Sequence, residues 1–165
     1  MAQPSPLTPF PWIDAVIILA LVGVNGVFAM SELAIVSARR PRLQAAERAG
    51  SKGAHAALLL AADPGRFLSA VQIGITLIGI LAGAYSGASL GPPVADRLHW
   101  LGFSADTTST IGFVLVIGVT TYASLIIGEL VPKQFALRAP EPIAIFMALP
   151  ILWFARATAP LVWLL

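Results

Sequence analysis

The sequence predicts an all-α membrane protein with three transmembrane helices, short cytoplasmic helices and a kinked juxtamembrane helix at the membrane interface. Of its 165 residues, 58% are hydrophobic and 11% are charged, whereas a soluble domain has about 25% charged residues. The apolar residues form long stretches of about 20 residues, the length at which a helix crosses the hydrocarbon of a bilayer. The lipid bilayer is therefore the first partner that we expect.

The first predicted span covers about residues 13–38 and follows a proline-containing tail, residues 1–12. The tail has no basic residue, so we expect no cleaved signal peptide and an extracellular N-terminus. The connection after the span is basic, through Arg39, Arg40, Arg42, Arg48 and Lys52. It is expected to be cytoplasmic and to form one or two short surface helices, with breaks at Gly50, Gly53 and Pro64–Gly65.

Polar residues of the first span lie close to one face of the helix. Asn25 and Glu32 are seven residues apart and share that face, with Ser31 at its edge. Glu32 is near the cytoplasmic end, so we expect it to reach the interface or to pair with Arg39 or Arg40.

The second predicted span covers about residues 67–90, and an external loop of mixed charge, residues 91–108, follows it. One stripe of this span carries glycines at intervals of four, which predicts close helix packing: Gly79, Gly83, Gly87 and Gly91. Thr76 lies on the same stripe. Its hydroxyl, like that of Thr121 in the third span, either bonds to a carbonyl one turn back or adds an oxygen to a polar site.

The third predicted span covers about residues 108–130 and carries Glu129 near its end. Pro132 has no N–H, so the carbonyl of Gly128, four residues earlier, loses its helical partner. A proline also disfavours helical geometry in the residue before it. We therefore expect the helix to kink or end here, with bare carbonyl oxygens beside the carboxylate.

An ionisable residue within a span is a functional-site hypothesis by default. Broken helix ends coordinate cations in transporters, and Mg²⁺ and Ca²⁺ prefer oxygen ligands. Glu129 and Gly128 therefore predict a cation site. The alternative is a structural ion pair between Glu129 and Lys133, which are four residues apart.

The last segment, residues 141–165, has Pro150 and Pro160 in its interior, with Arg156 between them. An arginine at the centre of a span costs about 2.5–3.5 kcal/mol on insertion scales, and Trp153 and Trp163 favour the interface. A kinked helix along the inner leaflet is therefore preferred over a fourth span. The segment ends in the apolar sequence "VWLL", and we expect a cytoplasmic part to follow it.

The stretch "GELVPKQFALRAPE" after a span resembles the G-E-[IVL]-x-P-K signature of the DUF21 transmembrane domain of the CorC/cyclin M (CNNM) proteins, also called hemolysin-like. Three more stretches agree with it: "FAMSELAIVSARRPRL", "DPGRFLSAVQIGITLIGILAGAYSGASL" and "PLVWLL". The resemblance covers about residues 13–165, with the transmembrane core at 13–140. It implies a homodimer, cytoplasmic CBS domains beyond residue 165, and magnesium export thought to be coupled to Na⁺.

The resemblance also implies a bound Mg²⁺ ion, held by the signature glutamate, by polar side chains of the first two spans and by a backbone carbonyl. Carried over, Glu129 is the acidic ligand and the Gly128 region supplies the carbonyl. Many members have S-G-S-E where this chain has Ala29-Met30-Ser31-Glu32, and G-N-N-L-V-N where it has "GITLIG" at residues 74–79. The remaining ligand candidates are Asn25, Ser31 and Thr76.

Two functions follow from these observations. The first is the transmembrane domain of a transporter for magnesium or another divalent cation, with Na⁺ as a second candidate ion. The second is a membrane-anchored dimeric scaffold or ion sensor without transport.

We expect no enzyme, because His55 and His99 lie on opposite sides of the membrane in this topology and no nucleophile–base pair is visible. The net charge of +2 is too small to indicate nucleic acid. The expected location is the plasma or inner membrane, multi-pass, with a cytoplasmic C-terminus.

Overall fold

The computed structural model describes residues 9–100 and 104–164, and the regular elements in these ranges are all helices. In chain order they are α1 (Trp12–Ser37), α2 (Arg40–Arg48), α3 (Lys52–Ala62), α4 (Pro64–Trp100), α5 (Ala105–Leu125), the π-helical turn η1 (Ile126–Leu130), α6 (Val131–Arg138), α7 (Pro140–Ala157) and α8 (Ala159–Leu164). α5, η1 and α6 follow one another without a break and form one long helix. The all-α prediction is confirmed for these ranges, and most of the predicted tail, residues 1–12, lies outside them.

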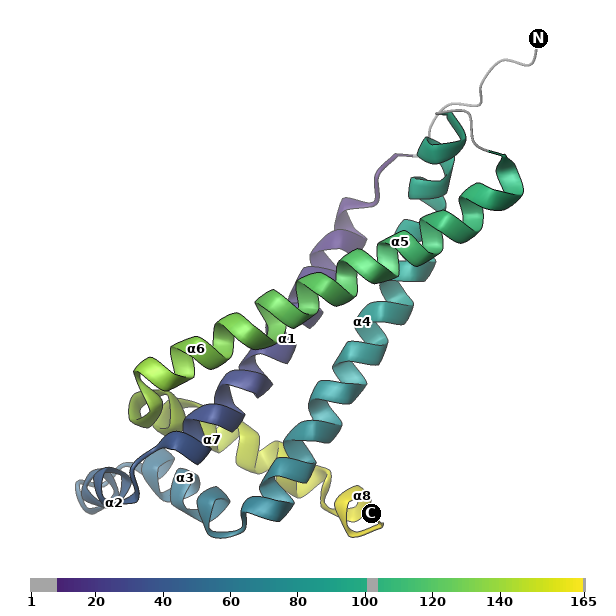
Figure 1. The fold of residues 1–165 in the computed structure, drawn as a ribbon. Coiled ribbons are helices and arrows are strands. Elements are labelled where there is room, and N and C mark those ends of the chain that lie inside the picture. The colour runs from purple at the N-terminus through teal and green to yellow at the C-terminus, as the bar shows by residue number, and fades with distance from the viewer. Residues whose placement is uncertain (1–8, 101–103, 165) are drawn as a thin grey trace.

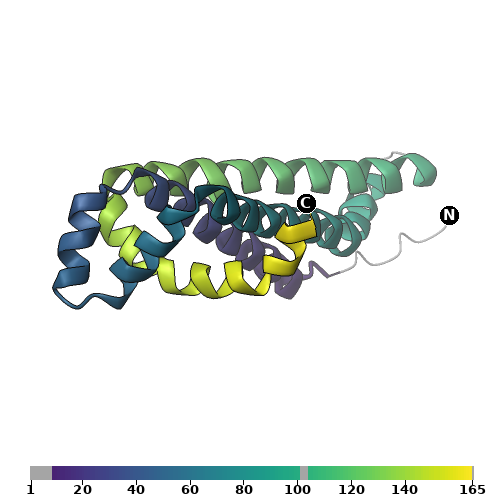
Figure 2. The same cartoon turned by 90° about the horizontal axis from the view of Figure 1, so that it is seen from below.

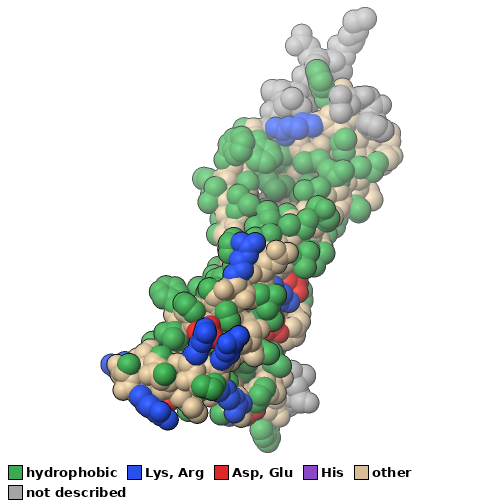
Figure 3. All heavy atoms as spheres, turned by 60° about the vertical axis from the view of Figure 1, so that its left-hand side comes forward, with side chains coloured by type: hydrophobic (Ala, Val, Ile, Leu, Met, Phe, Trp, Pro, Cys, Tyr) green, Lys and Arg blue, Asp and Glu red, His purple; other side chains and the backbone are tan. Residues whose placement is uncertain are grey.

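Three long helices, α1, α4 and α5–η1–α6, run along the length of the molecule (Figure 1). α4 packs on α1 and α5, and α1 also packs on η1 and α6. The helices α2, α3 and α7 gather at one end, which we call the foot (Figures 1 and 2). The main cluster of buried hydrophobic side chains lies at this end, and it includes Ile35, Leu43, Leu60, Val71 and Ile151. The middle of the molecule instead carries apolar side chains on its surface (Figure 3).

Within the part of the chain that the structure describes, four helices are long and apolar enough to cross a membrane: Trp12–Ser37, Pro64–Trp100, Thr107–Arg138 and Pro140–Ala157. The chain is therefore a multi-pass membrane protein by length and composition. The prediction of three spans differs from this set by one helix, α7. α7 is the least apolar of the four, and it lies at the foot against α3 and α1 rather than along the long helices (Figure 1).

The external loop predicted at residues 91–108 is wrong at both ends, because α4 continues through Pro92 and Pro93 to Trp100 and α5 already begins at Ala105. A proline has a φ that suits a helix but removes one hydrogen-bond donor. This segment packs on α5: Pro93 and Ala95 are buried, and Gly112 of α5 lies against the backbone of Gly91 and Ala95. The Arg97 guanidinium also donates to the Pro93 carbonyl oxygen at 2.7 Å.

The connection between the first two long helices folds into α2 and α3, as predicted. Gly50 separates them with a φ of +93°, a conformation that favours glycine. Gly53, predicted as a second break, instead lies inside α3 and is buried. A Cβ at Gly53 would collide with the backbone carbonyl of Ile145 in α7, so this glycine allows the two helices of the foot to approach.

The predicted glycine stripe of the second span divides into two parts. Gly87 and Gly91 pack against Phe113 of α5, which confirms close packing for this half. A Cβ at Gly79 or Gly83 would meet nothing within 4 Å, so these two glycines make no close helix contact within the chain. They line a pocket instead, described below.

Gly112→Ala is expected to destabilise the packing of α4 on α5 by about 1–2 kcal/mol, as overpacking in a well-packed contact does. A Cβ at this position would lie 2.9 Å from two backbone atoms of α4, the amide nitrogen of Ala95 and the carbonyl oxygen of Gly91. Gly118→Ala on the same helix is the control, because a Cβ there meets nothing within 4 Å. The control should be neutral or stabilising by up to about 1 kcal/mol. Thermal unfolding in detergent compares the two, and equal melting temperatures would contradict the packing described here.

Candidate cation site

Of the two outcomes that the sequence predicts at Pro132, a kink or a helix end, the second does not occur, because the third long helix widens there into the π-helical turn η1 and continues. The Val131 N–H bonds to the carbonyl of Ile126, five residues earlier. Val131 also keeps helical angles, φ −64° and ψ −48°, although it precedes the proline. In a π turn each N–H bonds to the carbonyl five residues earlier instead of four. The helix therefore accommodates Pro132, which has no N–H to donate, and continues as α6.

The carbonyl of Gly128 bonds to Asn25 of α1, whose Nδ2 donates to it at 3.1 Å. α1 and η1 approach closely at this point: a Cβ at Gly128 would lie 3.0 Å from the Val22 carbonyl oxygen. The Asn25 side chain is only 4% exposed. Its Oδ1 is buried and accepts no hydrogen bond from the described residues. Buried acceptors of this kind are uncommon, and this one can serve as an oxygen ligand.

A pocket of about 220 Å³ opens beside this contact, between α1, α4 and the third long helix. We call it the bend pocket. Its polar lining comes from Asn25, Thr120, Thr121, Ser124 and Glu129, and its α4 wall includes Gly79 and Gly83. Amide, hydroxyl and carboxylate oxygens are the ligands that Mg²⁺ and Ca²⁺ prefer. The pocket therefore has the donor set of a hard-cation site with a single carboxylate.

Two of these hydroxyl residues, Thr120 and Ser124, were not recognised from the sequence. The available signal was their spacing, because Thr120, Ser124 and Gly128 repeat every four residues and so share a face of the helix. Thr121, by contrast, falls on the same helical face as Glu129, so the sequence already offers its hydroxyl for a polar site.

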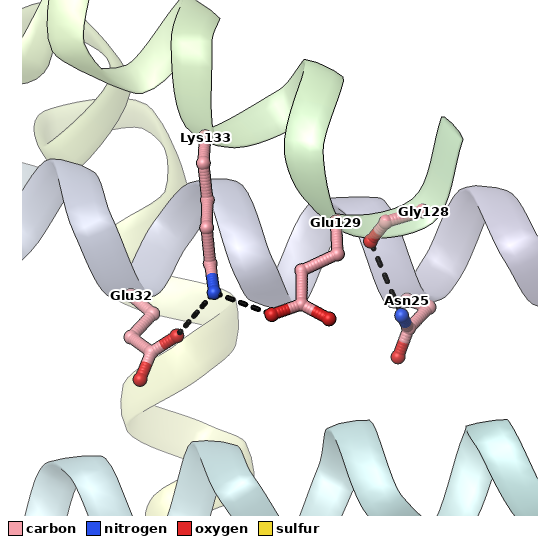
Figure 4. A network of polar contacts seen from close by, with 5 residues as sticks. All are labelled: Asn25, Glu32, Gly128, Glu129 and Lys133. Carbon is pink, nitrogen blue, oxygen red and sulfur yellow. Dashed lines mark hydrogen bonds and ion pairs between the residues drawn. The ribbon is translucent and has the colours of Figure 1, made fainter. Parts of the chain in front are cut away.

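Lys133 places its ammonium between two carboxylates from different helices (Figure 4). Its Nζ lies 2.7 Å from Glu129 Oε1 and 3.8 Å from Glu32 Oε2. All three side chains are half-buried. The structural pair between Glu129 and Lys133 is therefore present in this structure.

Glu32 does not pair with Arg39 or Arg40, which corrects that prediction. Arg40 donates instead to the Ala61 carbonyl oxygen at 2.9 Å, so it ties α2 to the end of α3. Glu32 is left facing Lys133 across the contact between α1 and α6.

The structure brings together Asn25, Gly128 and Glu129 of the predicted ligands, but not Ser31 or Thr76. The Ser31 hydroxyl is buried and donates to the Val27 carbonyl oxygen at 2.6 Å, one turn back on α1. Thr76 is exposed and lines a separate groove of about 660 Å³ on α4, together with Glu32 and Gln72. Neither residue lines the bend pocket.

Comparisons with known proteins agree with this architecture. The family model described as the cyclin M transmembrane N-terminal domain matches residues 16–165. The UPF0053 protein sll0260 of Synechocystis is 49% identical over 148 residues, covering 90% of this chain and 33% of that protein. The UPF0053 protein YhdT of Bacillus subtilis is 32% identical over 159 residues, 93% and 33% of the two chains. The polyamine export protein of Haemophilus influenzae is 32% identical over 152 residues, 88% and 34%. The chain thus spans about a third of the length of these relatives.

Proposed function

The chain belongs to the family of cyclin M transmembrane N-terminal domains, and on this premise we propose that it is the membrane domain of a cation transporter. The cation would bind in the bend pocket, with Mg²⁺ as the first candidate and Na⁺ as a possible coupling ion. The observation that carries the proposal is the meeting of Asn25, Gly128 and Glu129 at a π turn. There a buried amide oxygen that accepts no hydrogen bond from the described residues shares a pocket with a carboxylate.

The residues of the pocket have separate roles in this proposal. Glu129 supplies the negative charge, and Asn25 Oδ1 and the hydroxyls of Thr121 and Ser124 supply neutral oxygens. Mg²⁺ needs only one or two carboxylates because it keeps several of its waters. The Nδ2 of Asn25 meanwhile holds the Gly128 carbonyl, so the amide fixes the π turn and faces the pocket with its oxygen.

Lys133 competes with any cation that binds Glu129, because its ammonium already occupies one carboxylate oxygen. Glu32, 3.8 Å away, gives the ammonium a second partner when it leaves Glu129. The lysine can thus change partners without losing all of its compensating charge.

We expect Lys133→Gln to raise the apparent cation affinity by up to about fivefold, since a partly exposed ion pair contributes up to about 1 kcal/mol. Stability without added cation should fall by a similar free energy. Lys133→Arg is the matched control, because it keeps the charge and should keep the competition. Titration of the melting temperature with Mg²⁺ measures both effects. If Lys133→Gln lowers the melting temperature equally at every Mg²⁺ concentration, the lysine is structural and does not compete.

An alkyl polyamine is the second candidate substrate. One relative is named a polyamine export protein, and the geometry adds an independent observation. Lys133 is itself a primary alkylammonium, and its Nζ lies between the carboxylates of Glu129 and Glu32. The same two carboxylates could therefore receive the ammonium of a linear amine, with the neighbouring polar groove on α4 accommodating the rest of the chain.

We further propose that the foot is cytoplasmic and the N-terminus extracellular. Among the described residues, Arg97 is the only one of the ten Lys and Arg residues at the end of α4 far from the foot. Such an asymmetry places the basic side in the cytoplasm. On this orientation α7 lies along the inner leaflet, where its exposed Trp153 and Arg156 suit the interface.

A homodimer and cytoplasmic CBS domains beyond residue 165 also remain part of the proposal. The outer face of α4 leaves three polar residues exposed: Ser69, Gln72 and Thr76. Polar side chains are costly against lipid, so a second copy of the chain would stabilise this face.

A cation panel tests the proposed function. Thermal unfolding of the purified domain is measured with Mg²⁺, Ca²⁺, Mn²⁺, Na⁺ and spermidine at equal ionic strength, because a ligand that binds only the folded state raises its stability. Selective stabilisation by Mg²⁺ supports the first candidate, and a larger response to spermidine supports the second. Flux into proteoliposomes then separates a transporter from the remaining alternative, a scaffold or sensor that binds the cation without moving it. No response to any cation would overturn the proposal.

A further inference from the structure

The foot carries a groove between α3 and α7 that the cation site does not involve. Its larger part measures about 550 Å³. It continues into a hollow of about 250 Å³ at the start of α4, and both parts share Leu59, Leu152 and Arg156. We call this continuous depression the foot groove.

Three cations line the foot groove along its length: Lys52, Arg156 and Arg66. None of their side chains forms an ion pair with the residues that the structure describes. Lys52 is also the first residue of α3, whose N-terminus adds a partial positive charge. The groove thus has a cation at each end and one between them.

Two acidic residues line the groove as well, and each has a local partner. Glu47 Oε1 lies 2.6 Å from His55 Nδ1. Asp63 Oδ1 accepts a hydrogen bond from the Arg66 backbone N–H at 3.2 Å. With three cations against two carboxylates, one positive charge is in excess, and a single anionic group would balance it.

The walls of the groove are apolar. Leu59 and Leu149 are exposed there, and Trp153 is 71% exposed. Tryptophan favours the level of the lipid headgroups, and arginine extends its charged end towards that level while its stem covers apolar surface. A ligand that fits must therefore join an anionic head to an apolar tail.

We propose that the foot groove binds an anionic phospholipid, with its phosphate at Arg156, the middle cation, between the positive charges of Lys52 and Arg66, and an acyl chain along Leu59, Leu149 and Trp153. Basic pockets between helices on the cytoplasmic side of membrane proteins bind lipid headgroups in this manner. The site rests on the proposed position of the foot at the cytoplasmic surface of the membrane, but it does not depend on the cation proposal. It assigns to α7 the role of holding one wall of a lipid site at the membrane surface.

Short-chain lipids test the site on the purified domain. Dihexanoyl phosphatidylglycerol should raise the melting temperature, and dihexanoyl phosphatidylcholine should raise it much less. Lys52→Gln and Arg156→Gln should each weaken the phosphatidylglycerol response about fivefold, the effect of one basic residue at an anionic surface. Arg138→Gln on α6 is the charge-matched control, because Arg138 is exposed and does not line the groove. Its response should equal that of the wild type.

Three results would overturn the proposal: equal responses to the two lipids, equal weakening in the Arg138→Gln control, or a response to glycerol phosphate as large as that to the lipid. The last result would assign the groove to a free phosphate. The wild-type response to phosphatidylglycerol should also fall as salt rises, because salt screens exposed charges. The salt dependence is measured on the wild type and so tests the proposal even where a variant fails to fold. A salt-independent response would exclude a headgroup bound by charge.

Discussion

Glu129→Gln is expected to abolish the stabilisation of the domain by its cation. At a ligand concentration of about 100 Kd a single site contributes about 2.7 kcal/mol to the folded state, and in the variant this contribution should fall to nearly zero. Glu129 is the only carboxylate that lines the bend pocket among the described residues. Glutamine keeps the shape and one oxygen but removes the charge. The cation would then face only neutral oxygens, beside the ammonium of Lys133.

The variant should change the cation-free protein much less. The pair between Glu129 and Lys133 is half-buried, and such pairs contribute about 0–1 kcal/mol. Lys133 also keeps Glu32 as a partner. The two contributions separate in one experiment, a melting-temperature titration of wild type and variant with Mg²⁺ and with spermidine.

Glu32→Gln is the control for this titration. Its carboxylate lies near the same ammonium but does not line the bend pocket, so the Mg²⁺ response should persist. If Glu129→Gln keeps the full response, the cation binds elsewhere and Glu129 is only a partner of Lys133. If spermidine stabilisation is lost in both variants while Mg²⁺ has no effect, the two carboxylates act together on an ammonium ligand.

The long helices could be predicted from the sequence because their apolar runs leave few alternatives. α1, for example, begins and ends within a residue of the predicted range 13–38. The second half of α4 could not be predicted, since Pro92 and Pro93 are local signals for a loop. The contact that keeps them helical involves Gly112, which lies in another helix. At this point the packing of one helix on another overrides the preference of the two prolines for a loop.

The site was predicted in part for the same reason. Proline has no N–H, so the sequence alone predicts that the Gly128 carbonyl lacks its partner within the helix. Its donor, Asn25, is 103 residues away, and no spacing rule connects the two. A helical wheel places residues on faces but does not say how one helix is turned towards its neighbour. That rotation removes Thr76 from the pocket and leaves Gly79 and Gly83 open to it.

Asn25→Leu is expected to destabilise the cation-free domain by about 1–3 kcal/mol, the cost of leaving a buried acceptor without its donor. Leucine has the same branched shape and the same number of side-chain heavy atoms, but it cannot donate, and the Gly128 carbonyl can find no replacement donor on Pro132. The cation response should fall as well, because Asn25 Oδ1 is lost from the pocket. The same titration therefore measures a structural and a binding effect.

Ser31→Ala is the matched control, because Ser31 is also a buried polar residue of α1. Its hydroxyl bonds only to the Val27 carbonyl, one turn back, which lies within the helix's own hydrogen-bonding pattern. The control should therefore retain both its stability and its Mg²⁺ response. If Asn25→Leu behaves like the control, the π turn forms without Asn25, and the Asn25 oxygen is not a ligand of the cation. If the variant is less stable but Mg²⁺ raises its melting temperature as much as that of the wild type, Asn25 fixes the turn and Glu129 binds the cation without it.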